Sequence, residues 1–109
     1  MADDQKREAS FKKSIEFKEN YIEHLKKNPD IAKRFAEFVA AKKKRPPDRM
    51  PSDHKLKGRL SEYSECHLAG DSCLVYRDKD NIVHLLIICS HDDLCGPRER
   101  SMAKRLSMM

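Results

Sequence analysis

Three histidines of this chain lie in polar stretches beside apolar, strand-like runs: His54, His67 and His91. Imidazole gains and loses a proton near neutral pH, so two or three converging histidines can form a general acid–base set. Cleavage of RNA by its own 2′-hydroxyl needs such a set. One group deprotonates the 2′-oxygen, another protonates the departing 5′-oxygen, and cations stabilise the crowded phosphorane. This reaction requires no metal. His24 and His84 lack such surroundings, and we expect them to be structural.

A metal site is the main alternative, because cysteines accompany these histidines. The candidate ligands are Cys66, His67, Cys89, His91 and Cys95. Their spacing does not match a zinc site: there is no Cys-x2-Cys pair, and the adjacent Cys66 and His67 would point to opposite faces of a strand. We therefore predict no metal site. Nothing in the sequence indicates a thiol of lowered pKa, so a cysteine nucleophile is not predicted either.

The composition excludes several classes of protein. At 109 residues we expect one domain with a modest core. Residues 1–10 are charged and lack the apolar stretch of a secretory signal, so the four cysteines indicate reduced thiols and a cytoplasmic protein. The longest uncharged apolar stretch, residues 85–89, is too short to cross a membrane. The three glycines, Gly58, Gly70 and Gly96, cannot form a phosphate-binding loop, and we expect no small-molecule cofactor.

The positive charge is concentrated in residues 41–60. The whole chain carries a formal net charge of +5, and this segment alone carries +6, with only Asp48 and Asp53 opposing its basic side chains. Such a segment suits a phosphate backbone, or it can be a solvated helix end and loop. A membrane surface is less favoured, because no apolar face accompanies the lysines. The basic residues are Lys42, Lys43, Lys44, Arg45, Arg49, Lys55, Lys57 and Arg59.

Two helices are predicted in the first half of the chain. The clearer one begins at Asn28, a preferred N-cap residue followed by Pro29, and ends before Pro46. A shorter helix precedes it and ends near Lys27. Periodicity leaves open whether residues 14–17 extend this shorter helix or form a strand. The apolar residues at helical spacing are Tyr21, Ile22 and Leu25 in the first helix, and Ile31, Phe35, Phe38 and Val39 in the second.

The second half is typical of a β-meander. Strands are predicted over residues 60–68, 73–76 and 82–90, with turns at residues 69–71 and 78–81. The third strand is apolar on successive residues, so we expect it to be central with both faces covered. A sheet packed under two helices would supply that cover. Residues 97–109 form a basic tail that is either a short helix or disordered.

Four short motifs occur in order between residues 50 and 96, and together they resemble the YafQ branch of the RelE toxin superfamily. The family pattern has D-H-P-L-x-G, then Y-R-[DE]-x-H-x-x-x-D-W, then L-[IV]-Y, then G-[TS]-H-x-x-L-F. The spacing is kept without gaps. The matching stretches here are DHKLKG at 53–58, YSECH at 63–67 with Asp71, LVY at 74–76, and SHDDLCG at 90–96.

The resemblance implies a toxin of a type II toxin–antitoxin pair: an endoribonuclease that enters the ribosomal A site and cuts mRNA there. Its partners would be a cognate antitoxin, the ribosome with its 16S rRNA, and mRNA. The implied α+β fold has two N-terminal helices packed on a twisted antiparallel sheet of three to four strands, with the active site on the opposite, concave face. Residues 1–96 would form this domain and residues 97–109 a basic tail. The resemblance favours residues 14–17 as the first strand.

The resemblance also assigns roles. His54, His67 and His91 match the three motif histidines, with His91 as general acid and the other two as base or phosphate binders. Asp71 matches the supporting aspartate, and Glu65 matches the acidic neighbour of the histidine. The predicted RNA-binding residues are Lys42, Lys43, Lys44, Arg45, Lys55, Lys57, Arg59 and Arg77.

The chain departs from the family pattern at several positions. Ser72 stands where the family has Trp, which removes a base-stacking surface. Ile87 stands where an Arg is usual, which removes a cation near the scissile phosphate. Cys95 replaces a Phe and Lys55 a Pro. Arg77 or an arginine of the tail is a candidate replacement for the lost cation. A non-catalytic RNA- or ribosome-binding module therefore remains the alternative to an active nuclease. A third alternative is a basic domain with structural histidines only, which clustering of the histidines would count against.

Overall fold

A five-stranded mixed sheet forms the centre of the protein. The computed structural model describes residues 9–44 and 47–109. The strand order is β1-β5-β4-β3-β2; β1 runs parallel to β5, and the other neighbours are antiparallel. The predicted α+β class is confirmed, whereas the antiparallel sheet of three to four strands is wrong. The strands are β1 (Ser10–Lys13), β2 (Asp53–Lys55), β3 (Ser64–Ala69), β4 (Ser72–Lys79) and β5 (Ile82–Cys89).

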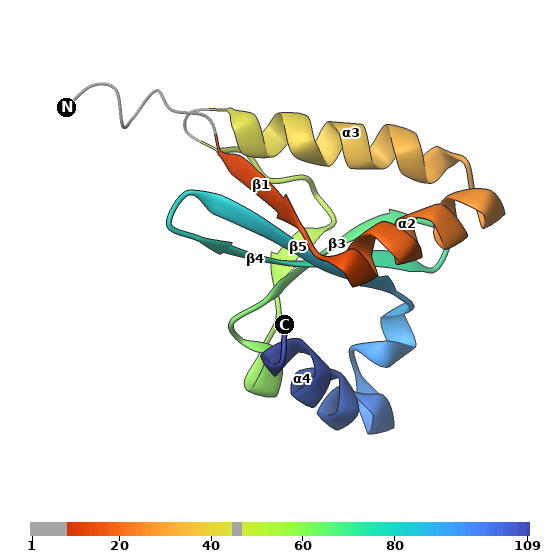
Figure 1. The fold of residues 1–109 in the computed structure, drawn as a ribbon, viewed down its shortest axis with the longest axis vertical. Coiled ribbons are helices and arrows are strands. Elements are labelled where there is room, and N and C mark those ends of the chain that lie inside the picture. Colours follow the sequence, from red (N-terminus) through yellow and green to blue (C-terminus); the bar gives the residue numbers. More distant parts are fainter. Residues whose placement is uncertain (1–8, 45–46) are drawn as a thin grey trace.

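Helices cover both faces of this sheet (Figure 1). On one face lie α2 (Ile15–Lys27) and α3 (Asp30–Lys43), and on the other lies α4 (Glu99–Ser107). An ion pair between Arg105 and Glu16 joins α4 to α2. No helix in the described part of the chain is long and apolar enough to span a membrane.

The predicted boundary between the two N-terminal helices is confirmed. The Asp30 N–H donates to Asn28 Oδ1 at 3.1 Å, and Pro29 has a φ of −60°, so the Asn-Pro pair begins α3 as expected. The helix ends at Lys43, shortly before the two prolines.

Residues 14–17 begin a helix, so the preference for a strand there is wrong. Ser14 is the N-cap of α2: its Oγ accepts a hydrogen bond from the Phe17 N–H at 2.9 Å, and its hydroxyl donates to the Leu86 carbonyl. The first strand lies just upstream, at Ser10–Lys13. That strand holds a single apolar residue, Phe11, so neither period-2 alternation nor an apolar run marked it.

The predicted strand over residues 60–68 begins later, at Ser64. A 3₁₀ turn over Gly58–Leu60 precedes it, and Gly58 takes a positive φ of 63° that suits glycine. Residues 53–55 pair with β3 instead and form the edge strand β2. The hairpin between β4 and β5 is confirmed: Asp80 and Asn81 both have positive φ, as a two-residue type I′ turn requires.

The central position of β5 is confirmed, and each of its faces belongs to a separate apolar cluster. Val83 and Leu85 pack with the residues of α2 and α3, whereas Ile87 and Cys89 pack with Met102 of α4 and its neighbours. The two predicted helices cover only one face. The other is covered by α4 in the C-terminal segment, where a short helix was one of the two predicted alternatives.

Candidate active site

The candidate active site is built around one buried carboxylate, that of Glu65 in β3. His54 Nε2 lies 3.2 Å from Glu65 Oε1, and His91 Nδ1 lies 3.8 Å from the same oxygen. The Glu65 side chain is only 4% exposed, whereas both imidazoles are more than half exposed. The structure therefore brings two of the three predicted histidines together on a shared acidic residue.

The position of His54 follows from the alternation of side chains along β2. Asp53 points to the helix side, where its carboxylate pairs with Lys42 Nζ at 2.8 Å and accepts a hydrogen bond from the Tyr76 hydroxyl. The next residue must then face the opposite side of the sheet. His54 is also the register partner of Glu65, so the two side chains lie side by side on that face.

Hydrogen bonds at the end of β5 hold His91. Its backbone N–H donates to Asp71 Oδ1 at 3.2 Å. Ser90 and Asp93 form a capping box around the 3₁₀ turn His91–Asp93, and Arg98 donates to Asp93 Oδ1 at 3.0 Å. Partial burial raises the pKa of Asp93, but hydrogen bonds from Arg98 and Ser90 outweigh it, and the pKa lies below its usual value. Asp71 thus holds the turn at His91 by accepting this backbone hydrogen bond.

His67 is on the same face but does not join the pair. It lies two residues from Glu65 along β3, and its Nε2 lies 2.5 Å from the Gly70 carbonyl oxygen. Within the described residues, no hydrogen bond or ion pair connects its ring to His54, His91 or Glu65. His67 is therefore beside the cluster, with its Nε2 held at the Gly70 carbonyl oxygen.

The sequence-based predictions did not include Cys73, which lies next to the candidate active site. Its Sγ, a Glu65 carboxylate oxygen and a His91 ring nitrogen all lie within 4.8 Å of one another. Cys73 is the register partner of His67, so the β3–β4 pairing brings it next to the site. Burial and nearby Glu65 raise the pKa of this thiol to about 12. The residue spacing does not reveal this position of Cys73, because it depends on the antiparallel pairing of β3 and β4 across the turn at Gly70.

The predicted RNA-binding residues divide into several groups. Lys42 is only 4% exposed and is ion-paired with Asp53, so we remove it from the RNA-binding set as a correction. Arg45 lies outside the described residues. Lys44 is near Asp48 (3.4 Å), and Arg59 is near Glu99 (3.7 Å). Lys43, Lys55 and Lys57 are exposed.

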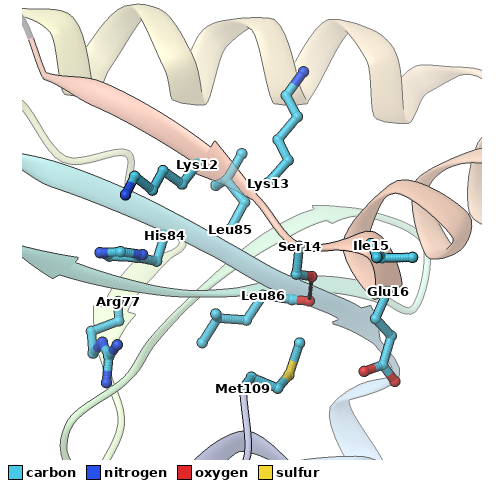
Figure 2. Close-up of a pocket in the computed structure, with 10 residues that line it drawn as sticks. All are labelled: Lys12, Lys13, Ser14, Ile15, Glu16, Arg77, His84, Leu85, Leu86 and Met109. Carbon is cyan, nitrogen blue, oxygen red and sulfur yellow. Dashed lines mark hydrogen bonds between the residues drawn. The ribbon is translucent and has the colours of Figure 1, made fainter.

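Arg77 is separated from the cluster. It lies four residues beyond Cys73 along β4, roughly 13 Å away at strand spacing. Its side chain lines a pocket of about 360 Å³ between β1, β5 and the C-terminal residue (Figure 2). His84 and Lys12 stand beside it there. Burial, with the charges of Arg77 and Lys12, lowers the pKa of His84. Arg77 therefore does not replace the cation missing at Ile87.

Each departure from the family motif has a structural counterpart. Ser72 faces α2, where its hydroxyl lies 2.6 Å from His24 Nδ1, and the pair joins the helix to the sheet. Ile87 is fully buried in the cluster that α4 completes. Cys95 is exposed, and its thiol donates to the His91 carbonyl at 3.5 Å. Because Met102 and Leu106 of α4 belong to the same cluster, an apolar side chain at position 87 suits the face that this helix covers.

Comparisons with known proteins agree with this architecture. The family model of YafQ, a bacterial toxin of type II toxin–antitoxin systems, matches residues 4–96. A metal-bound toxin from Helicobacter pylori is 27% identical with a TM-score of 0.58, and the match covers 80% of this chain and 99% of that one. No curated protein matches this chain at a significant level.

Two further solved structures share the fold. One is the Escherichia coli DinJ–YafQ toxin–antitoxin complex, at 16% identity and a TM-score of 0.63, covering 83% of this chain and 100% of that one. Another is the YoeB/ParE toxin from Agrobacterium tumefaciens, at 13% identity and a TM-score of 0.63, covering 75% and 98%. The family match spans all five strands and both N-terminal helices and stops before α4. The chain belongs to the YafQ family of bacterial type II toxin–antitoxin toxins.

Proposed function

We propose that this protein is an endoribonuclease toxin that cleaves mRNA in the ribosomal A site. The observation that carries the proposal is the convergence of His54 and His91 on Glu65. The two ring nitrogens contact the same oxygen, so they are no farther apart than the sum of the two distances, 7.0 Å. A single phosphorane lying between the exposed rings can contact both.

The proposed reaction is transfer of the phosphate from the 5′-oxygen to the 2′-oxygen. His54 takes the proton of the 2′-hydroxyl, and the oxygen attacks phosphorus. The bond between phosphorus and the 5′-oxygen then breaks, and His91 gives its proton to the departing oxygen. The products are a 2′,3′-cyclic phosphate and a 5′-hydroxyl. Glu65 orients both rings and stabilises whichever is protonated, and His67 binds a phosphate oxygen.

Exposed basic side chains next to His54 would hold the RNA. Lys55 directly follows it and Lys57 lies two residues beyond Lys55, and Lys43 and Lys44 lie at the end of α3. These cations would contact phosphates of rRNA and mRNA, so binding would weaken as salt is added. Such a toxin would act in the cytoplasm, where ribosomes are found.

A cognate antitoxin is the expected protein partner. YafQ is complexed with DinJ in one structure of this fold, and YoeB from Staphylococcus aureus with YefM in another. Co-expression with the product of an adjacent small gene, followed by co-purification, tests this partner.

The enzymatic proposal is tested by induced expression without antitoxin, with growth and primer extension on cellular mRNA as readouts. Wild type should arrest growth and give discrete cuts. His91→Ala should lower cleavage by about 10²–10⁴-fold and relieve the arrest, and His54→Ala should also relieve it. His84→Ala is the matched control, because this histidine lies away from the cluster. Toxicity that is unchanged in the alanine variants of His54, His67 and His91 would refute the catalytic assignment.

A non-catalytic ribosome-binding module is the second candidate, and the burial of Ile87 beneath α4 favours it. The family's arginine at this position is lost, so transition-state stabilisation is reduced. Tight ribosome binding without cuts in bound mRNA would support this candidate over the nuclease.

A further inference from the structure

We propose that Glu65, Cys73 and His91 form a binding site for a zinc ion. The three residues come from β3, from β4 and from the turn after β5, and the pairing of these strands brings their ligand atoms within 4.8 Å of one another. A carboxylate, a thiolate and an imidazole are all zinc ligands, and a thiolate disfavours Mg²⁺ and Ca²⁺.

The distances are close to those of a tetrahedral site. Zinc–ligand bonds of 2.0–2.3 Å place neighbouring ligand atoms about 3.3–3.6 Å apart. The cluster must therefore contract by about 1 Å around the ion. Glu65 and Cys73 are fixed in the sheet, whereas the His91 side chain is 62% exposed and can rotate toward them. We therefore expect His91, the exposed ligand, to make the largest movement when the ion binds.

A second observation points to a ligand at this place. Glu65 Oε2 is buried, and it lacks a hydrogen-bond partner among the described residues. A buried carboxylate oxygen left unpaired is costly, and such groups in native proteins call for an explanation. A cation bound by the Glu65 carboxylate together with Cys73 and His91 would compensate this buried group.

The site leaves a coordination position open. Three protein ligands plus a water are the arrangement of zinc sites that remain accessible, and the exposed side of His91 supplies the entry path. His54 Nε2 lies 3.2 Å from Glu65 Oε1, next to the carboxylate ligand. Binding of the ion is independent of the proposed nuclease activity.

The test uses the full-length chain, purified with reductant and freed of metal. Co²⁺ replaces zinc as a spectroscopic probe, because thiolate ligation gives an intense near-ultraviolet charge-transfer band, and Zn²⁺ is then titrated in competition. One ion per chain and a thiolate band are expected. Cys73→Ser should abolish the band and weaken zinc binding by more than about 100-fold, since lost outer partners alone cost 10–100-fold. Excess Mg²⁺ should not compete.

Cys95→Ser is the matched control, because Cys95 is an exposed thiol close to His91 in the sequence and outside the cluster. It should keep both the band and the affinity. Circular dichroism without metal checks that Cys73→Ser is folded. His91→Gln, at an exposed position, gives a second test that leaves the core intact and should also weaken zinc binding. The proposal would be overturned if the wild type gave no charge-transfer band. It would also be overturned if Cys95→Ser lost the band while Cys73→Ser retained it.

Zinc would also occupy two groups of the proposed catalytic set, and this consequence rests on the proposed function. Cleavage by wild type should stop at saturating Zn²⁺ and return when a chelator is added. Cleavage that persists at saturating zinc would contradict ligation by Glu65 and His91. A metal-free wild type that never cleaves would refute the nuclease instead, and the cobalt spectrum would still report on the site.

Discussion

At the scale of single residues, Lys42 shows how burial changes the meaning of a charge. In the sequence it is one of eight cations in a basic segment. In the structure its ammonium lies over the rings of Phe38 and Tyr76, 5.5 and 5.0 Å from their centroids, and pairs with Asp53. Tyr76 donates its hydroxyl to the same carboxylate. This network anchors Asp53 on the helix side of β2, and alternation along the strand then turns His54 toward Glu65.

Replacing Lys42 should therefore destabilise the protein strongly. Lys42→Ala leaves the carboxylate of Asp53 buried without its cation, and the free energy of unfolding should fall by about 3–5 kcal/mol in urea titrations. Lys43→Ala, at the exposed neighbouring position, should change it by less than about 0.5 kcal/mol. Equal effects of the two substitutions would mean that the Lys42–Asp53 pair is not the anchor.

The His91 turn gives a pH-dependent prediction at the same scale. The pKa of Asp93 is lower in the folded protein, so its ionised form stabilises the fold above its unfolded pKa of about 3.9. That contribution is lost as the pH falls through the folded pKa. Asp93→Asn should therefore be less stable than wild type at pH 7, and the difference should shrink below about pH 4.

Thermal unfolding of both proteins from pH 3 to pH 7 measures the effect of Asp93→Asn. Asp92→Asn is the control, because the neighbouring Asp92 is exposed and outside the capping box. A difference that stays constant over this range would contradict the assignment of Asp93.

At the scale of elements, α4 completes the fold. Its sequence is mostly basic and polar, yet Met102 and Leu106 are buried against the sheet face that carries Ile87. A helix with two apolar residues four apart has little helical stability of its own, so it forms because the sheet offers it an apolar face. Ile87, where the chain departs from the family motif, thus belongs to the same apolar cluster as the buried residues of α4.

Truncating the buried face of α4 should destabilise the whole domain. Leu106→Ala removes a side chain that is 2% exposed, and the expected loss is about 2–5 kcal/mol in the free energy of unfolding. Lys104→Ala, on the exposed face of the same helix, should be close to neutral. If Leu106→Ala is also neutral, α4 does not pack on the sheet in solution.

At the scale of the whole molecule, one face of the sheet carries the aromatic core and the opposite face carries the candidate active site. The face covered by α2 and α3 holds the aromatic core and the buried Lys42–Asp53 pair. At one end, the opposite face carries Glu65, His54 and His91, and the remainder is covered by α4. The exposed lysines Lys55 and Lys57 follow His54 in the sequence, and alternation along the edge strand β2 places Lys55 on the helix side.

RNA binding should therefore depend on salt through these exposed lysines. The double substitution Lys55→Ala with Lys57→Ala should weaken binding to single-stranded RNA and reduce the slope of log K against log salt by about 0.7 per lost contact. Fluorescence anisotropy at several salt concentrations measures both quantities. Lys79→Ala, in the distant β4–β5 hairpin, should leave the slope unchanged. An unchanged slope in the double variant would remove this surface from the RNA interface.

Much of the fold could be predicted because its signals are local. The Asn28-Pro29 start of α3, the polar turn within residues 78–81 and the apolar run of β5 each depend on residues close in sequence. The motif order around residues 50–96 was sufficient to predict the family and the three candidate histidines, of which the structure brings His54 and His91 together on Glu65. Strand β1 could not be predicted, because it is short and owes its conformation to pairing with β5.

The sequence by itself determined the α+β class, the family and which histidines are candidates for catalysis, since local periodicity, turn chemistry and motif spacing carry that information. Only the tertiary structure decided which charges are exposed, because burial depends on the elements packed around a residue. It turned Lys42 inward, tied His67 to Gly70 and covered Ile87 with α4. It also brought Cys73 to Glu65 and His91, since strand pairing brings together residues that are far apart in the chain.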